Sequence, residues 1–303
     1  MKRIIVICGP TGIGKTSFAI SIARRFNGEI IGADSMQIYK HMNIGTAKPD
    51  SEELKQAPHH LVNFLDPKND FDAGQYVKAA DKVINEIIAR KKIPIIVGGT
   101  GFYIRALLHG LFRAKPVCQK TLLQLNKDLK DNGSLILYKK LVKCDPKAAK
   151  KIHPNDSFRV IRALEVYQTT GSKISDRQKK HNFDEVRYHY IKIGLYMDRE
   201  KLYDRINKRV DIMLHQGLLK EVTTLLENGY SFDLKAMQSI GYKHMAMFIE
   251  NEIDWEETVR LLKRDTRRYA KRQLTWFRKD KEINWLLQSQ FHLAENMIKE
   301  FLT

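Results

Sequence analysis

The hydrophobic pattern begins with an unbroken apolar run, IIVIC at residues 4–8, which is short enough for a buried parallel strand. A glycine-rich stretch follows, and beyond it Phe18, Ala19 and Ile22 recur at helical spacing. Apolar runs at residues 29–33 and 93–97 indicate two more strands. This alternation of strands and helices predicts an α/β fold.

The middle of the chain, residues 115–187, shows no strand pattern and is rich in Lys and helix-forming residues. Breaks at Asn132-Gly133, Asp145-Pro146, His153-Pro154 and Thr170-Gly171-Ser172 divide it into several helices. We therefore expect an all-helical insertion domain between two parts of the core, 1–114 and 188–303.

One helix of this insertion is expected after Asn155-Asp156-Ser157, which are good N-cap residues. Its apolar side chains should pack on one face while its arginines face outward, either toward a partner or simply toward solvent. The apolar set is Phe158, Val160, Ile161 and Leu164, and the arginines are Arg159 and Arg162.

After residue 188 the alternating run YIKIGLY at 190–196 predicts a return to the sheet, and INWLL at 283–287 predicts a last strand before a terminal amphipathic helix. One long helix is expected over 201–228, ended by Gly229. A second is expected over 255–279, started by an Asp254–Glu257 capping box.

The glycine-rich stretch matches G-x4-G-K-[ST], the phosphate-binding loop, in its required place between a strand and a helix. Backbone N–H groups, the helix N-terminus and the Lys15 ammonium would hold an anion, and the Thr16 hydroxyl suits Mg²⁺. These features predict a P-loop three-layer core with a parallel sheet that binds a polyphosphate. The diphosphate-binding set is Gly9, Pro10, Thr11, Gly12, Ile13, Gly14, Lys15 and Thr16.

Asp34 stands directly after the second predicted strand, where the ligand crevice of an open α/β sheet lies. Three interpretations compete: a general base, a Mg²⁺ ligand through water, or the N-cap of the short segment 35–39.

After the 93–97 strand an ATPase commonly has a metal-binding Asp, but here the chain continues Gly98-Gly99-Thr100. The glycines allow close backbone approach, and Thr100 offers a hydroxyl. The same residues would also serve as a simple turn before a helix at 102–108.

Two sets of cations stand out in the last third of the chain. Arg205 and Arg209 share a helical face and could clamp a diphosphate, or pair with Asp204 and Asp211 on the surface. The predicted 255–279 helix carries nine cations against one acid after its first turn, with aromatic residues interleaved. Such a face is typical of nucleic-acid binding rather than of a solvated helix, which normally alternates charge signs.

Composition supports the same partner, because 53 Lys and Arg against 35 Asp and Glu give a formal charge of +18. The three cysteines are widely separated, so we expect reduced thiols, with Cys8 in the core. No apolar run approaches the ~20 residues that span a bilayer, and no cleavable signal precedes the first strand. We expect a cytoplasmic monomer with no obligate protein partner.

Several blocks together resemble the tRNA dimethylallyltransferases of bacterial type, collinearly over nearly the whole chain. The blocks are GPTGIGKT, ADSMQIYKHMNIGTAKP, APHH, VGGTGFY, HPNDSFRVIRALEVY, QSIGYKH and AKRQLTWFRK. Of these, DSMQIYK and GGTGFY are specific to the family. The resemblance implies transfer of a prenyl group from dimethylallyl diphosphate to the exocyclic amine of the adenosine immediately 3′ of the anticodon.

The resemblance also implies roles. Asp34 would take the proton from the adenine amine, Thr100 would hydrogen-bond near the reacting centre, and Arg205 with Arg209 and Mg²⁺ would neutralise the departing diphosphate. The insertion and the basic helix would hold the anticodon stem-loop, and part of 115–123 would also touch it. The implied tRNA contacts are Asp34, Ser35, Met36, Gln37, Thr100, Phe158, Arg159, Val160, Ile161, Arg162, Gln238, Ser239, Ile240, Gly241, Tyr242, Lys243, Arg264, Arg268, Lys271 and Arg272.

Two other classes of function fit part of the pattern. A P-loop small-molecule kinase fits the loop and the arginines, but it does not need a basic helix. A non-catalytic RNA-binding NTPase fits the charge, but it leaves DSMQIYK and GGTGFY unexplained.

Overall fold

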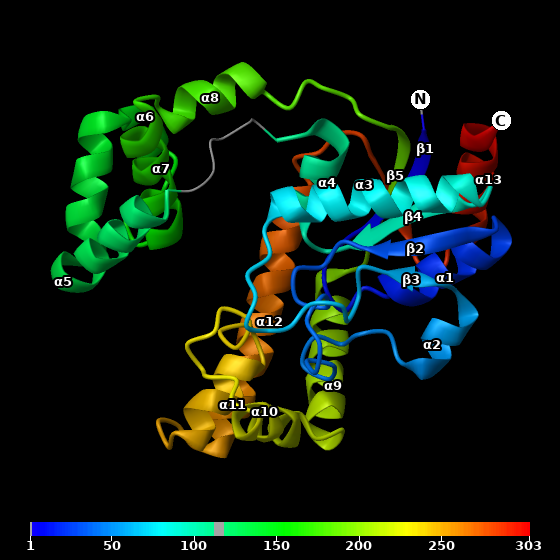
Figure 1. Cartoon of the computed structure of the whole chain (residues 1–303). Helices are drawn as coiled ribbons and strands as arrows, with labels where there is room; N and C mark the ends of the chain where they lie inside the picture. The colour runs from blue at the N-terminus through cyan, green and yellow to red at the C-terminus, as the bar shows by residue number, and fades with distance from the viewer. Residues whose placement is uncertain (1, 112–117) are drawn as a thin grey trace. The chain divides into compact units, whose positions relative to one another are not determined.

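A six-stranded parallel sheet with the order β3-β2-β4-β1-β5-β6 organises the larger part of the molecule (Figure 1). Its five longer strands lie where the apolar runs predict them, and the two-residue β3, which has no apolar run, was not predicted. The strands are β1 Arg3–Cys8, β2 Gly28–Gly32, β3 His59–His60, β4 Ile93–Gly98, β5 His189–Tyr196 and β6 Ile283–Leu287.

The register of the sheet brings three loops to one edge. Cys8 at the end of β1 pairs with Gly98 at the end of β4, and Gly32 at the end of β2 pairs with Val97. The carboxyl ends of parallel strands point the same way, so the phosphate loop, Asp34 and Thr100 meet beside one another. The sheet thus creates the crevice that the sequence predicts.

Helices cover both faces of this sheet, as a three-layer core requires. Helix α1 shares a hydrophobic cluster with α13 and the inner residues of β1 and β5, while α3 lies along the other face (Figure 1). The helices of this part are α1 Lys15–Arg25, α2 Ser51–Gln56, α3 Ala73–Ala89, α4 Gly101–His109, α9 Arg199–His215, α10 Leu218–Glu227, α11 Tyr242–Ile249, α12 Trp255–Phe277 and α13 Phe291–Leu302.

The single long helix predicted over 201–228 is wrong, because the chain forms α9 and α10 in its place. Gly217 separates them with a backbone φ of 95°, a conformation that glycine adopts readily and other residues avoid. The apolar periodicity continues across this break, which is why it does not reveal it. The predicted stop is right: α10 ends at Glu227, and Gly229 has φ 77°.

This break builds a second hydrophobic cluster away from the sheet. Ile38, Tyr39 and Met42, from the segment after Asp34, are buried against α9, α10, α11 and α12. The segment that carries Asp34 is therefore anchored by helices far along the chain.

The smaller unit, His109–Glu185, is helical, and the other unit comprises residues up to Leu108 and Val186–Thr303. Its helices are α5 Gln119–Cys144, α6 Pro146–Ala149, α7 Ser157–Thr170 and α8 Ile174–His181. Three of the predicted breaks lie at the junctions between these helices. The fourth, Asn132-Gly133, lies inside α5, where the backbone leaves helical geometry at Gly133. Asp156 caps α7 by accepting the backbone N–H of Arg159.

The predicted packing of α7 needs two corrections. Phe158 is 72% exposed, whereas Val160, Ile161 and Leu164 are buried as predicted. Arg162 does not face outward freely, because it pairs with the buried carboxylate of Glu165. Buried Val160 and Ile161 cannot offer their side chains to an RNA partner, so only the exposed positions of this stretch remain available.

The computed structural model describes residues 2–111 and 118–303. The predicted boundary after residue 114, and residues 115–117 of the segment expected to touch tRNA, lie outside the described residues. Within the described part, no helix has the length and apolar character that crossing a membrane requires. The thiols of Cys8, Cys118 and Cys144 are free, and Cys8 is buried as predicted.

Candidate functional site

The phosphate loop between β1 and α1 adopts the strained backbone that its glycines permit. Gly9 and Gly14 have φ angles of 146° and 93°, and a Cβ at Gly9 would lie 2.8 Å from the Leu195 carbonyl oxygen. Lys15 Nζ donates to the Pro10 carbonyl at 2.8 Å, so the ammonium lies across the loop. This is the anion cradle that the motif predicts.

Positive charge is concentrated here without a fully compensating acid. Burial lowers the pKa of Lys15 to about 8, and the Asp34 carboxylate opposes that shift while Arg209 adds to it. Burial also lowers the pKa of Arg209, again against Asp34. Asp34 therefore lies close enough to the phosphate loop to act on both cations, as its position after β2 predicts.

Asp34 uses one carboxylate oxygen to shape its own loop. Oδ1 accepts the backbone N–H of Met36 at 2.8 Å and of Gln37 at 3.3 Å. The segment 35–39 forms turns rather than a helix, so Asp34 caps a turn, and the predicted helical N-cap is wrong. Within the described residues Oδ2 makes no hydrogen bond, and a carboxylate oxygen left open can still accept a proton.

Thr100 joins the β4 loop to the Asp34 loop. Its Oγ1 accepts the Ser35 backbone N–H at 3.1 Å, and its own N–H donates to the Ala33 carbonyl at 3.1 Å. The interpretation of this segment as a turn before α4 is also correct for the backbone, since Tyr103 N–H donates to the Thr100 carbonyl. The hydroxyl, however, serves Ser35.

The glycines on either side of Thr100 are needed for close packing. A Cβ at Gly98 would lie 2.0 Å from the Ala33 carbonyl oxygen, and one at Gly101 would lie 2.2 Å from the Trp276 ring. A carbon atom cannot lie that close to either group, so only glycine fits at positions 98 and 101.

Arg205 and Arg209 both face the phosphate loop from α9. Arg209 Nη1 donates to Thr11 Oγ1 at 3.4 Å, and Arg205 Nη1 donates to Gln288 Oε1 at 3.1 Å. The Gln288 side chain also packs against the loop, because a Cβ at Gly14 would lie 2.8 Å from Gln288 Nε2. The two guanidinium groups flank the loop, as a diphosphate clamp requires.

The alternative, in which these arginines pair with Asp204 and Asp211 on the surface, does not hold. Asp211 pairs with Lys263 at 2.6 Å instead. In the described part of the chain neither Arg205 nor Arg209 forms an ion pair.

Helix α12 presents two different faces. One carries Tyr269, Gln273 and Trp276 and packs on the loops of the site. Gln273 is 6% exposed, and Trp276 lies edge-on to Phe102 at a ring distance of 6.4 Å. Burial raises the pKa of Tyr269, and the nearby Asp34 carboxylate adds to that shift. The sequence pattern placed Tyr269 and Trp276 among the aromatic residues of a nucleic-acid-binding helix, and it assigned no role to Gln273.

The cations of α12 also differ along the helix. Arg264 and Arg268 pair with Asp265 at 2.9 and 3.6 Å. Within the described residues, no ion pair involves Lys271 or Arg272. The unpaired charge therefore lies in the second half of the helix, next to the face that packs on the site.

The predicted capping box of α12 forms only in part. Asp254 accepts the Glu257 backbone N–H, but the Glu257 carboxylate pairs with Arg260 rather than with the Asp254 N–H. The helix starts where predicted, and its first turn is neutralised locally.

Glu221 of α10 holds the loop that follows the Asp34 turn. Its carboxylate accepts the backbone N–H groups of Asn43, Ile44 and Gly45 at 2.9, 2.8 and 3.1 Å, and the Tyr242 hydroxyl at 2.6 Å. No sequence pattern marks a lone Glu in a helix as such an anchor.

Gln37 completes this link from the other side. Its Nε2 donates to the Ala47 carbonyl at 2.9 Å, which ties the predicted tRNA-contact segment 34–37 to the loop that Glu221 holds.

Tyr242 illustrates the difference between a motif residue and a contact residue. Its side chain is fully buried, and a Cβ at Gly45 would lie 2.5 Å from its ring. The predicted tRNA contact of Tyr242 is therefore wrong for its side chain, whose role is to pack against the loop. Around it, Gln238 is exposed and Lys243 is near Asp265.

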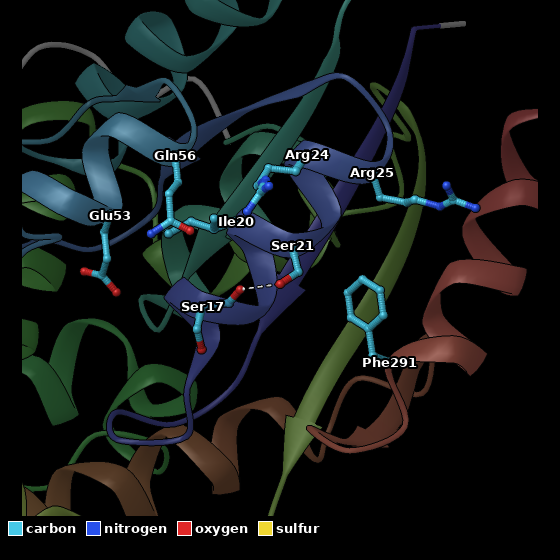
Figure 2. Close-up of a pocket in the computed structure, with 8 residues that line it drawn as sticks. All are labelled: Ser17, Ile20, Ser21, Arg24, Arg25, Glu53, Gln56 and Phe291. Carbon is cyan, nitrogen blue, oxygen red and sulfur yellow. Dashed lines mark hydrogen bonds between the residues drawn. The ribbon is translucent and has the colours of Figure 1, made fainter.

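A second hollow lies on the outer side of α1, between α1, α2 and the start of α13 (Figure 2). Ser17, Ser21 and Arg24 of α1 line it, with Glu53 of α2 and Phe291 of α13. Its charged lining residues are exposed or half-buried, and none belongs to the predicted site. We assign it no role.

Comparison with known proteins gives a family match over most of the chain, from the residues after Asp34 onward. The family model "IPP transferase" matches residues 37–280. The tRNA dimethylallyltransferase of Desulfosudis oleivorans is 47% identical over 301 residues, which cover 99% of this chain and 96% of that one. The tRNA dimethylallyltransferase of Acetivibrio thermocellus is 49% identical with the same two coverages.

Solved structures give the same fold. The tRNA isopentenylpyrophosphate transferase of Bacillus halodurans superposes with a TM-score of 0.74 at 39% identity, covering 100% of this chain and 97% of that one. A eukaryotic dimethylallyltransferase acting on tRNA superposes with a TM-score of 0.82 at 34% identity, covering 95% of this chain and 74% of that one.

Proposed function

This chain belongs to the IPP transferase family, and from that premise we propose how its site performs the reaction. It is a tRNA-prenylating enzyme rather than a small-molecule kinase. The specific reaction is transfer of the dimethylallyl group from dimethylallyl diphosphate to N6 of the adenosine immediately 3′ of the anticodon. The observation that carries this assignment to the site is the sheet register, which brings the Asp34 turn after β2 beside the phosphate loop after β1, so that the Asp34 carboxylate acts on the charges of Lys15 and Arg209.

The phosphate loop binds the diphosphate of the donor, which is the leaving group. Backbone N–H groups at the start of α1, the Lys15 ammonium and the guanidinium groups of Arg205 and Arg209 neutralise the charge that grows on it. The C–O bond to the allylic carbon breaks while a C–N bond to the adenine amine forms, and diphosphate leaves. Lys15 and Arg209 are desolvated by burial, so their charges act strongly on this group.

Asp34 is the general base. The adenine amine is a weak nucleophile, and Oδ2 accepts its proton as the new bond forms. Oδ1 is already engaged by Met36 and Gln37, so the carboxylate has a fixed orientation before the substrate arrives. The target base leaves its stack to reach this position.

The residues of the site fit Mg²⁺ only together with the phosphate oxygens of the substrate. No cluster of three or more His, Cys, Asp or Glu among the described residues could hold a metal ion. A single Thr16 hydroxyl together with phosphate oxygens matches the usual Mg²⁺ site of phosphate substrates. Bound there, the ion would supply further neutralisation of the diphosphate.

The tRNA contacts come from both units. The exposed members of the predicted set are Phe158 and Arg159 on α7, Gln238, and Arg268, Lys271 and Arg272 on α12. We propose that a single chain acts as a monomer in the cytoplasm, where tRNA is available, because the residues assigned to the reaction all belong to one unit of one chain.

The decisive experiment is incubation with dimethylallyl diphosphate and tRNA lacking the modification, followed by mass spectrometry of the nucleosides. We expect N6-dimethylallyladenosine. Phosphoryl transfer from ATP in the absence of tRNA would instead indicate a kinase, and tRNA binding without product would indicate a non-catalytic RNA-binding protein.

A further inference from the structure

The buried amide of Gln273 connects the two loops on which the reaction depends. Its Oε1 accepts the Thr11 backbone N–H at 2.8 Å, and its Nε2 donates to the Gly99 carbonyl at 2.9 Å. Thr11 belongs to the phosphate loop, and Gly99 belongs to the loop after β4. One side chain from α12 thus bonds both.

The backbone at Gly99 is adapted to this contact. A Cβ there would lie 2.2 Å from Gln273 Nε2, closer than any side-chain carbon can come to nitrogen. Gln273 therefore requires glycine at position 99. In the same way, Ala33 requires glycine at position 98 and Trp276 requires glycine at position 101.

The connection continues from Gly99 to the general base. The next residue, Thr100, accepts the Ser35 N–H through its hydroxyl and donates its own N–H to the Ala33 carbonyl, each at 3.1 Å. Asp34 stands between those two residues. A line of hydrogen bonds therefore runs from the phosphate loop through Gln273 and Thr100 to the backbone on either side of Asp34.

Such a line matters because prenyl transfer joins two separate substrates. The rate of a reaction between bound groups depends steeply on their separation, and a displacement of about 1 Å can cost on the order of 100-fold. This inference rests on the proposed function: we propose that Gln273 is a positioning residue. It sets the distance between the phosphate loop, which holds the donor, and the Asp34 carboxylate, which receives the proton of the acceptor.

Gln273→Met tests this directly, because Met keeps the length of the side chain and loses both hydrogen bonds. We expect the single-turnover rate of prenyl transfer to fall about 10- to 100-fold. The dissociation constants for dimethylallyl diphosphate and for tRNA should stay within about 3-fold, because neither substrate is held by Gln273 itself. Thr275→Ala is the matched control on the same helix, since Thr275 is exposed and its hydroxyl donates to the Lys271 carbonyl of its own helix at 2.9 Å.

Gln273→Glu supplies a readout that a merely structural residue would not give. A neutral glutamic acid accepts the Thr11 N–H through its carbonyl and donates its O–H to the Gly99 carbonyl, which reproduces both bonds. A carboxylate cannot donate. The ratio of variant to wild-type rate should therefore rise as the pH falls from about 8 to about 5, as the buried acid becomes neutral.

Product formed by the wild type tests the proposed function, and the ratios of variant to wild type test Gln273. A Gln273→Met enzyme that transfers at the wild-type rate would overturn the inference. So would a Gln273→Glu ratio that does not change with pH, or a loss of donor binding as large as the loss of rate. If Gln273→Met fails to fold, Gln273→Glu at low pH still decides the question.

Discussion

The phosphate loop and the Asp34 segment are neighbours in space, but they are held in place differently. The loop is supported largely from within, by Lys15 bonding Pro10 and by the first turn of α1 bonding Gly14, while Gln273 links it to the loop after β4. The Asp34 segment depends on groups far along the chain, chiefly Glu221 and the hydroxyl of Thr100. Local geometry thus supports the donor side, and tertiary contacts build the acceptor side.

This difference predicts that the two sides can be damaged separately. Changes to the phosphate loop should weaken donor binding. Changes to the Asp34 segment or to its distant supports should slow transfer or weaken tRNA recognition, with donor binding intact.

The largest separation is expected from Asp34→Asn, which keeps the shape of the side chain and removes its basicity. Asn can still accept the Met36 and Gln37 N–H groups, so the loop should survive. We expect single-turnover transfer to fall ~10² to 10⁴-fold, the range of general-base contributions. Donor and tRNA affinities should be nearly unchanged.

Two magnesium concentrations distinguish the remaining interpretations of Asp34. If Asp34 acted mainly on Mg²⁺ through water, donor affinity would also fall, and added Mg²⁺ would restore part of the activity. If Asp34 only capped its turn, Asn would replace it without loss, and near-normal turnover would refute the catalytic role.

The same contrast explains what the sequence could reveal. The strand, loop and helix at residues 3–25 were predictable because their signals lie in adjacent residues, and Asp34 because strand ends line the crevice. Glu221 and Gln273 were not, because their roles depend on which backbone groups tertiary folding brings to them. Gly217 was missed because the apolar stripe continues past it.

A smaller effect is expected when cations are removed from either half of α12. These substitutions test whether tRNA binding uses cations without an ion pair or cations that already pair with Asp265. Lys271→Ala with Arg272→Ala removes two cations that form no ion pair with any described residue. The slope of log tRNA affinity against log salt should lose about 1.4 to 1.8 in magnitude, since each phosphate contact contributes about 0.7 to 0.9. At 0.1 M salt this corresponds to roughly 25-fold weaker binding or more.

Arg264→Ala with Arg268→Ala is the matched control, because it removes the same formal charge from the same helix. These arginines already pair with Asp265, so the slope should change less. Equal slopes for the two double variants would mean that pairing within α12 does not decide which cations meet RNA. Donor affinity should be unaffected in both.

Glu221→Gln should give a still smaller effect on the acceptor side alone. An amide has one acceptor oxygen where the carboxylate has two, so the three backbone N–H groups of 43–45 and the Tyr242 hydroxyl cannot all be satisfied. We expect kcat/KM for tRNA to fall about 10-fold, the scale of one lost charge-assisted hydrogen bond, with the donor dissociation constant unchanged. Glu227→Gln, at an exposed site on the same helix, should behave as the wild type. A parallel loss of donor affinity would show that the two sides are not separable here.

The smallest expected effect tests the donor side by pH. Burial lowers the pKa of Lys15 to about 8, so the unliganded enzyme loses this positive charge as the pH rises through 8. A bound diphosphate favours the charged form, and binding above that pH must therefore take up a proton. We expect the Lys15 contribution to the dissociation constant of inorganic diphosphate, measured by calorimetry, to be constant below about pH 7.5. Above pH 8 the loss of the Lys15 charge should increase this dissociation constant, by at most about 10-fold per pH unit. Lys15→Arg is the control, because guanidinium stays charged throughout this range and the titration of diphosphate itself is common to both proteins. The difference between the two pH profiles isolates Lys15, and identical profiles would mean that its charge is not lost near pH 8. Transfer rates at saturating donor should not show the same difference, because the bound diphosphate keeps Lys15 charged over this range.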